Sequence, residues 1–231
     1  MKQIVKYILA WGIVLTFCCS CENINDIHEE YLNRGETIYT GVVDSLAITP
    51  GNERAKFKWL LNADPRITKV VIYWAQRTDS VVVEVNRTQA GAMWMEEILP
   101  FAEDSYIFEV VTKDDYGHRS MAESMTVDVY GPEYIGRLMN REIRSRNINS
   151  SGEGVLTWAA ILSNAIQYTL VKYTDYSDPA NPVDKEVRVE NDDTETILPG
   201  VRVGDVISVS SVFLPEGALD ELASNARSYT F

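Results

Sequence analysis

A repeat of 99 residues runs through this chain of 231 residues. Trp59 precedes Pro100 of an Ile-Leu-Pro segment by 41 residues, and Trp158 precedes Pro199 of a second such segment by the same distance. At the 99-residue offset a set of apolar residues recurs: Ala55, Phe57 and Trp59 align with Gly154, Leu156 and Trp158, and Phe108 and Val110 align with Ile207 and Val209. Because a whole alternating register recurs, the sequence indicates a tandem duplication.

Each copy has the pattern of short β-strands. In RAKFKWLL the apolar residues Ala55, Phe57 and Trp59 alternate with charged ones, which is the period of a half-buried strand. Seven such segments follow one another in the first copy, separated by turn-rich pieces such as NADP and DDYGHRS. The sequence therefore predicts an all-β chain of two tandem immunoglobulin-like β-sandwiches, at 39–131 and 132–231, with Gly131-Pro132 ending the first.

Certain residues of the first copy resemble those of fibronectin type III domains. They are Trp59, the segment VVIYW, and Leu99-Pro100 followed by Tyr106, Phe108 and Val110 at alternate positions. The resemblance implies a tyrosine corner, in which the Tyr106 hydroxyl bonds to the backbone of the preceding loop. In the second copy Asp205 stands where the first has Tyr106, so we expect another group to hold that corner.

The N-terminus predicts secretion and a lipid anchor. Lys2 and Lys6 precede an apolar run at 7–17, which is shorter than the ~20 residues that a membrane-spanning helix needs. Ser20-Cys21 resembles the lipobox of bacterial lipoproteins, which predicts a signal peptide at 1–20, a diacylated Cys21 and a tether at 21–38. The chain has no cysteine after Cys21, which favours an anchor over the alternative of an ordinary secreted protein with incidental cysteines.

The charge and the wider resemblance point to the bacterial surface. Removing the two lysines of the signal peptide changes the net charge from −13 to −15, which makes nucleic-acid binding unfavourable. The early acidic residues of the tether resemble surface-export signals of Bacteroidota lipoproteins, although a solvated linker has the same composition. With YTGVVDSLAITPG, DPRITKVVIYW and LMNRE, nearly the whole chain resembles Bacteroidales lipoproteins of unknown function that accompany glycan-uptake systems. This implies an outer-membrane, surface-facing protein with glycan-uptake proteins or a polysaccharide as partners.

Catalytic and metal-binding patterns are weak. His28 and His118 are the two histidines, and their spacing fits neither a zinc site nor a recognisable serine triad. Adjacent acids such as Glu96-Glu97 point to opposite faces of a strand, and Asp114-Asp115 before Gly117 is typical of a turn, with a calcium site as the weaker alternative. We therefore expect no enzyme, no cofactor and no metal.

The strand registers predict an exposed apolar patch. Counting from Trp59 places Val71 and Tyr73 in the core and Ile72 and Trp74 outside, while Ile107 and Val111 alternate with inward Phe108 and Val110. The candidate interaction patch is therefore Ile72, Trp74, Ile107 and Val111. It is either a partner site or a seam covered by the second domain. Counting back from Pro100 places Met93, Met95 and Ile98 inward and Trp94 outward on the opposite sheet, away from Trp74.

These patterns favour a non-catalytic surface lipoprotein, either a protein-interaction or a spacer module of a glycan-acquisition assembly. The alternative is a carbohydrate-binding lipoprotein that uses exposed aromatic residues. Ser45 and Ser80 each follow an aspartate and precede an aliphatic residue, which matches the O-glycosylation pattern of exported Bacteroidota proteins. The same dipeptide is also common where strands begin.

Overall fold

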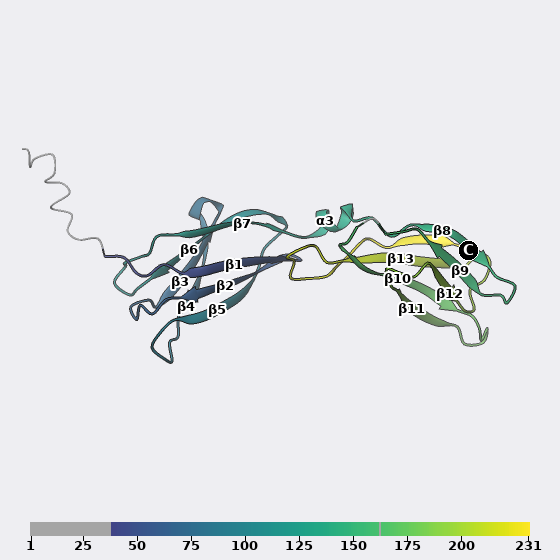
Figure 1. The fold of residues 1–231 in the computed structure, drawn as a ribbon, viewed down its shortest axis with the longest axis horizontal. Helices are drawn as coiled ribbons and strands as arrows, with labels where there is room; N and C mark the ends of the chain where they lie inside the picture. The colour runs from purple at the N-terminus through teal and green to yellow at the C-terminus, as the bar shows by residue number, and fades with distance from the viewer. Residues whose placement is uncertain (1–37, 162) are drawn as a thin grey trace, which may run out of the picture. The chain divides into compact units, whose positions relative to one another are not determined.

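A computed structural model describes residues 38–161 and 163–231 of the chain. Nearly all of its regular structure is β (Figure 1). The first copy contains β1 (Asp44–Gly51), β2 (Arg54–Leu61), β3 (Lys69–Trp74), η1 (Ala75–Arg77), β4 (Asp79–Glu84), β5 (Met93–Pro100), β6 (Asp104–Lys113) and β7 (Glu123–Val129). The remainder contains α3 (Pro132–Arg137), β8 (Ile143–Ile148), β9 (Gly154–Trp158), β10 (Ile166–Asp175), β11 (Val183–Val189), β12 (Glu195–Leu198), β13 (Val206–Phe213), β14 (Leu222–Ala223) and β15 (Arg227–Thr230).

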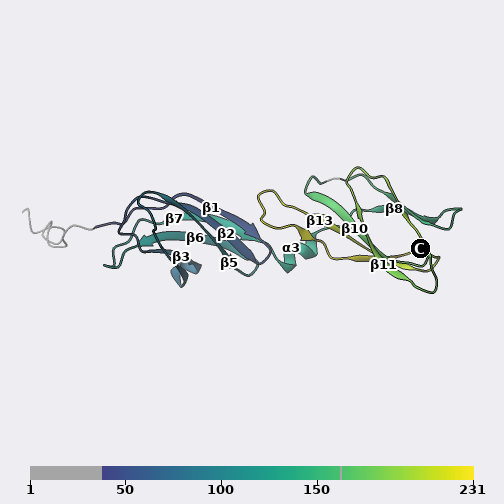
Figure 2. The ribbon, with the colours of Figure 1, turned by 90° about the horizontal axis from the view of Figure 1, so that it is seen from below.

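The strands form two sandwiches of antiparallel sheets. In the first, the sheet β1-β2-β5 faces the sheet β4-β3-β6-β7, in which β3, β6 and β7 lie side by side (Figure 2). In the second, β12-β9-β8 faces β11-β10-β13-β14, with β15 also pairing with β13. The predicted fold class is confirmed: the described residues form two tandem immunoglobulin-like sandwiches of antiparallel sheets. None of the described helices is long and apolar enough to cross a membrane.

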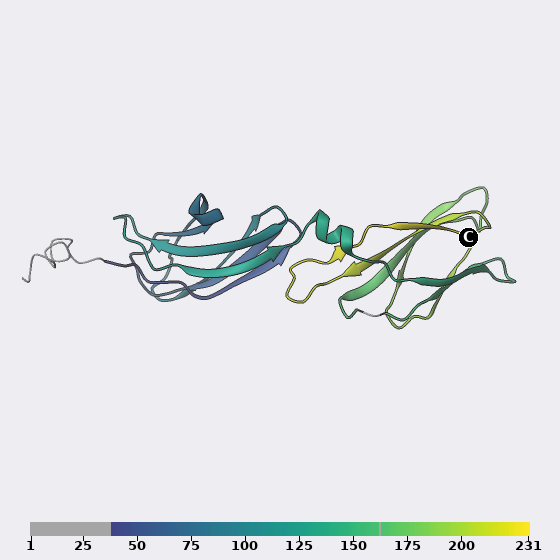
Figure 3. The same cartoon turned by 90° about the horizontal axis from the view of Figure 1, so that it is seen from above.

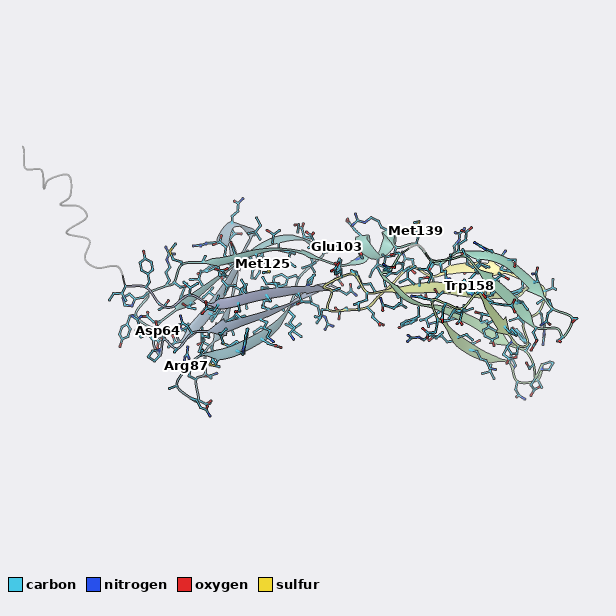
Figure 4. All side chains as sticks on the ribbon, viewed as in Figure 1. Asp64, Arg87, Glu103, Met125, Met139 and Trp158 are labelled. Atoms are coloured by element: carbon cyan, nitrogen blue, oxygen red, sulfur yellow. The ribbon has the colours of Figure 1, made fainter. Side chains whose placement is uncertain are left out.

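Each sandwich encloses its own apolar core. Phe57, Trp59 and Phe108 are fully buried in the first core, and Leu156 and Ile207 are fully buried in the second. Trp158 is 3% exposed and lies among the strands of the second sandwich (Figure 4). The inward faces predicted from the repeat are therefore confirmed, because the aligned residues are buried in both copies.

The third strand faces the other way from the prediction. Val70 and Ile72 are fully buried in the first core and Trp74 packs against it, whereas Tyr73 lies on the opposite face. The reason is the pairing of Ile72 with Val110, since residues directly opposite one another share a face of the sheet. Residues 70–74 are all apolar, so the sequence does not show which alternate residues face the core. On β5, Ile98 is also 52% exposed, contrary to expectation.

The two corners are held by different groups. The Tyr106 hydroxyl donates to the carbonyl of Ala102 at 3.1 Å, as the fibronectin type III resemblance implied. In the second sandwich, the Asp205 carboxylate accepts the backbone N–H of Arg202 at 2.7 Å. A carboxylate that accepts from the loop thus replaces a hydroxyl that donates to it.

Residues after β7 form the short helix α3 (Figure 3). The Glu103 carboxylate, labelled in Figure 4, accepts the first backbone N–H groups of this helix, from Glu133 and Tyr134, both at 2.6 Å. A carboxylate in this position satisfies donors that have no partner within the helix. Asp220 of the second copy contacts the turn between β1 and β2. Its carboxylate accepts from the backbone N–H of Asn52 at 2.9 Å and forms an ion pair with Arg54, the first residue of β2.

Candidate functional site

Two of the four predicted patch residues lie at one pocket of the first sandwich. Trp74 and Ile107 line this pocket, which has a volume of about 340 Å³. The other two do not: Ile72 is fully buried in the core, and only 2% of Val111 is exposed. The predicted continuous exposed patch is therefore wrong at Ile72 and Val111.

The two failures have different causes. Ile72 lies on the inner face because β3 pairs with β6 one position away from the predicted register. Val111 does lie on the outer face, since it alternates with the core residue Val110. There it is directly opposite Val71, which is itself only 3% exposed, so the two valine side chains shield each other from solvent.

The pocket is built where β3 ends and β6 begins. Its wall is the turn η1, and the complete lining is Tyr73, Trp74, Ala75, Gln76, Arg77, Asp104, Ser105, Tyr106, Ile107 and Glu109. Trp74 is half-buried and its ring meets that of Phe101 edge-on, with centroids 5.2 Å apart. Phe101 also contacts Tyr106 at 5.3 Å, so core aromatic rings support the pocket from below.

The turn η1 has a strained backbone. Ala75, Gln76 and Arg77 have φ angles of 48°, 57° and 66°, all in the left-handed region that favours glycine. Each such residue costs about 1–3 kcal/mol and persists only where its surroundings enforce it. The Thr78 side chain closes the turn by donating to the carbonyl of Ala75 at 2.7 Å. Conformational strain of this kind is concentrated at functional sites, which makes the turn the strongest local indication of one.

Charged groups of both signs face the pocket. Arg77 donates from Nε to Glu109 Oε2 at 2.6 Å, and its guanidinium lies 5.5 Å from the centre of the Tyr73 ring. Lys113, which does not line the pocket, lies at the same distance from that ring. The site therefore combines an aromatic ring, hydrogen-bond donors and carboxylate acceptors in a small open hollow. The sequence did not indicate Arg77 as a site residue, because nothing in AQRT predicts a left-handed turn without glycine.

The region around His118 is a turn held by side chains. The Asp114 carboxylate accepts from the backbone N–H of Tyr116 and His118, both at 2.9 Å, and lies 2.6 Å from His118 Nδ1. Burial opposes ionisation of Asp114, but these hydrogen bonds outweigh it and lower the pKa of the carboxyl. Asp115 accepts from the Thr68 hydroxyl. The predicted turn is confirmed, and each of these acids already has a partner.

The pair Glu96-Glu97 divides between the faces of β5, as expected. Glu96 is exposed and bonds Lys56 at 2.7 Å and Lys58 at 3.2 Å, and the hydrogen bond from Lys56 contributes most to lowering the pKa of Glu96. Glu97 lies opposite the buried Phe57, on the inner side. Among the described residues, no group of three or more metal-ligating side chains is close enough together to hold a metal ion.

The remaining candidates lie apart from the pocket. Trp94 is 54% exposed on the opposite sheet, as predicted, and Lys58 lies 5.0 Å from its ring centre. Ser45 and Ser80 are both exposed, on β1 and on the edge strand β4, so a modifying enzyme has access to them; their glycosylation stays a prediction. Cys21 and the rest of the tether up to residue 37 lie outside the described residues.

Comparison with known proteins identifies a family. A family model described as a domain of unknown function, DUF4998, matches residues 21–222. A search of curated proteins found no match. Among solved structures, a segment of two fibronectin type III domains from chicken tenascin is similar at 13% identity and a TM-score of 0.33, over 83% of this chain and 99% of that one. The FN1–FN3 domains of chicken CNTN1 are similar at 11% identity and a TM-score of 0.35, over 83% and 67%.

Proposed function

Since the chain belongs to the DUF4998 family, described as a domain of unknown function, we propose a function from its own residues: a non-catalytic, lipid-anchored binding protein of the bacterial surface. In this proposal it serves a glycan-acquisition assembly as a protein-interaction or spacer module. The observation that carries the binding role is the strained turn at 75–77, which forms the wall of an open pocket. The turn joins β3 to β4 as a hairpin, and non-glycine residues held in the left-handed region are concentrated at binding and catalytic sites, which supports a binding role.

The anchor rests on the sequence at Ser20-Cys21. The family match begins at Cys21, which is the first residue that would remain after cleavage at the lipobox. A single acyl chain gives marginal membrane binding, whereas two chains hold a protein stably, so diacylation of one cysteine suffices as an anchor. The outer-membrane location and the glycan-uptake partners rest on the resemblance of the whole chain to Bacteroidales lipoproteins.

Replacing the anchoring residue tests the proposed location. We expect Cys21→Ala to move the protein from the membrane fraction to the soluble periplasmic fraction, because no thiol remains at the lipobox position. Cell fractionation followed by immunoblotting measures this. The matched control is Cys19→Ala, which leaves Cys21 in place and is expected to stay membrane-bound. Retention of the Cys21→Ala protein in the membrane would contradict the proposed anchor.

The second candidate function is carbohydrate binding by the protein itself. It is favoured by the lining of the pocket, in which Trp74 and Tyr73 lie beside the ion pair of Arg77 and Glu109. Sugar hydroxyls both donate and accept hydrogen bonds, and the C–H face of a sugar ring packs on apolar side chains. A glycan array probed with residues 22–231 separates the two candidates. Binding to defined glycans supports this one, whereas binding confined to protein partners supports the first.

A further inference from the structure

A second pocket lies on the second sandwich, on the sheet that contains β10, β11 and β13. Its volume is about 370 Å³, close to the 340 Å³ of the pocket at η1. It is lined by Lys172, Tyr173, Thr174, Asp184, Lys185, Glu186, Val206, Ile207 and Ser208. Both volumes lie at the lower end of the range of small-molecule sites, roughly 300–1,000 Å³.

The two pockets overlap at equivalent positions of the two copies. Tyr73, Trp74, Ala75, Ile107 and Glu109 line the first, and the residues 99 positions later, Lys172, Tyr173, Thr174, Val206 and Ser208, line the second. The backbone agrees: Tyr73 pairs with Glu109 across β3 and β6, and Lys172 pairs with Ser208 across β10 and β13. The two pockets therefore share five equivalent positions, whereas the strained turn at 75–77 belongs to the first pocket and the β11 residues belong to the second.

The chemistry of the two pockets is similar although the residues differ. Each contains an aromatic residue that packs against the core, Trp74 in one and Tyr173 in the other. Each has one exposed aliphatic side chain at its edge, Ile107 of β6 at 64% exposure and Val206 of the equivalent strand β13 at 59%. Each has an ion pair at its surface, between Arg77 and Glu109 or between Lys172 and Glu186 at 3.1 Å.

We propose that these pockets are two equivalent binding sites, each of which takes a segment of the same uncharged, hydroxyl-rich polymer, a neutral polysaccharide. The inference rests on the proposed binding function and adds to it a second site and a ligand class. Both signs of charge line each pocket, so neither sign of ligand charge is selected. A hydroxyl group can accept from the cation and donate to the neighbouring carboxylate, and the aliphatic side chain can pack on the C–H face of a sugar.

The duplication of the site explains why the ligand is a polymer. A ligand with repeated units can occupy both pockets of one chain, so its second contact forms at a high effective concentration. The gain in apparent affinity reaches about 10²–10⁴ where the geometry permits it. A short oligosaccharide occupies one pocket at a time and gains nothing from the second. An anionic polymer is a poor candidate, because the mature chain carries a net charge of −15.

Matched single substitutions test the proposal on the mature full-length chain. Ile107→Glu and Val206→Glu each place a carboxylate on the exposed aliphatic position of one pocket, 99 residues apart. The control pair is Ile98→Glu and Ile197→Glu, also 99 residues apart, exposed at 52% and 50%, on the opposite sheet of each sandwich. The probes are starch, xylan, galactomannan and mixed-linkage β-glucan in affinity gel electrophoresis, followed by calorimetry with a short oligosaccharide of whichever polymer binds.

We expect at least one polymer to retard the unmodified chain and each pocket variant to weaken that binding about tenfold or more, with the double variant abolishing it. The short oligosaccharide should bind with a stoichiometry of two, reduced to one by either pocket variant. The control variants should behave like the unmodified chain. Melting temperatures near the unmodified value show that a loss of binding is not a loss of folding.

Three results would overturn the proposal. If no neutral polysaccharide retards the unmodified chain, the ligand class is wrong. If one pocket variant alone abolishes binding and the other has no effect, the sites are not equivalent. If the control variants weaken binding as much as the pocket variants do, the site lies elsewhere. None of these results alters the membrane fractionation of the Cys21→Ala protein, so the proposed anchor stands or falls separately.

Discussion

In the first sandwich Phe57 lies opposite Glu97, and in the second Leu156 lies opposite Thr196, each 99 residues later. The facing sheets agree as well, since Ile72 pairs with Val110 and Val171 with Val209. The register is thus the same in both copies, while most side chains differ. Two sequences that share little beyond their apolar alternation therefore specify one arrangement of strands, because the alternation decides which face is buried.

The two buried tryptophans show where the copies differ. Trp158 donates from Nε1 to the Thr196 hydroxyl at 2.8 Å. Trp59 occupies the equivalent position in the first core, and its buried Nε1 has no hydrogen-bond partner among the described residues. The residue equivalent to Thr196 is Glu97, which does not bond to this nitrogen. A shared register therefore does not guarantee that the polar atoms within it are satisfied.

Each copy contains an equivalent pair of buried hydroxyl residues, Thr112 with Ser120 in the first and Ser211 with Ser224 in the second. The backbone N–H of Thr112 donates to the Ser120 hydroxyl at 3.0 Å, and that of Ser211 donates to the Ser224 hydroxyl at 2.9 Å. Backbone bonds in the other direction run from Ser120 to Thr112 and from Ser224 to Ser211. Thr112 and Ser211 are 99 residues apart, whereas the serines are 104 apart. Because the spacing differs, sequence comparison at one offset missed this polar anchor.

Cavities in the two cores test whether the sandwiches fold separately. Phe57→Ala is expected to destabilise the first sandwich by about 3–5 kcal/mol and Leu156→Ala the second by about 2–5 kcal/mol, since both side chains are fully buried. Differential scanning calorimetry and limited proteolysis should show loss of the affected sandwich while the other stays protected. If either substitution unfolds the whole chain in one transition, the copies form a single cooperative unit.

Exchanging the tryptophan partners tests the difference between the cores. Thr196→Val should remove the acceptor of Trp158 and cost about 1–3 kcal/mol, because a buried N–H is left without a partner. Glu97→Thr places a hydroxyl at the equivalent position and should stabilise the first sandwich by about 1 kcal/mol. Urea denaturation of each variant measures both. An unchanged stability of the Glu97→Thr protein would mean that the hydroxyl does not reach Trp59.

The smallest expected effect concerns acid stability. The pKa of Asp175 is lowered to about 2, chiefly by a hydrogen bond from Lys185 and then by the Ser177 hydroxyl and backbone N–H. The pKa of Asp64 is also lowered to about 2, mainly by Arg66. A carboxyl whose pKa is lower when folded than when unfolded stabilises the fold above the unfolded pKa, so this stability is lost as the pH falls from about 4 towards 2.

Replacing each acid localises this loss. Asp175→Asn should lower the melting temperature of the second sandwich at pH 7, and the difference from the unmodified protein should shrink as the pH falls towards 2, where the aspartate becomes protonated in the folded state as well. Asp64→Asn should do the same for the first sandwich. Asp192→Asn, at an exposed position, serves as the control. A difference at Asp175 or Asp64 that persists unchanged down to pH 2 would show that packing, and not ionisation, is responsible.

The sequence by itself determined the architecture, because the strand period and the tyrosine corner depend on residues close together in the chain and the 99-residue repeat can be read directly from the sequence. RAKFKWLL alternates cleanly, so the burial of Phe57 and Trp59 followed from it. Only the tertiary structure decided which residues of β3 face the core. KVVIYW is apolar on both faces, and it is the pairing with β6 that turns one of these faces inward. The left-handed turn at 75–77 contains no glycine to favour it, and in the structure it is held by the hydrogen bond of Thr78 to Ala75 and by the contact of Arg77 with Glu109.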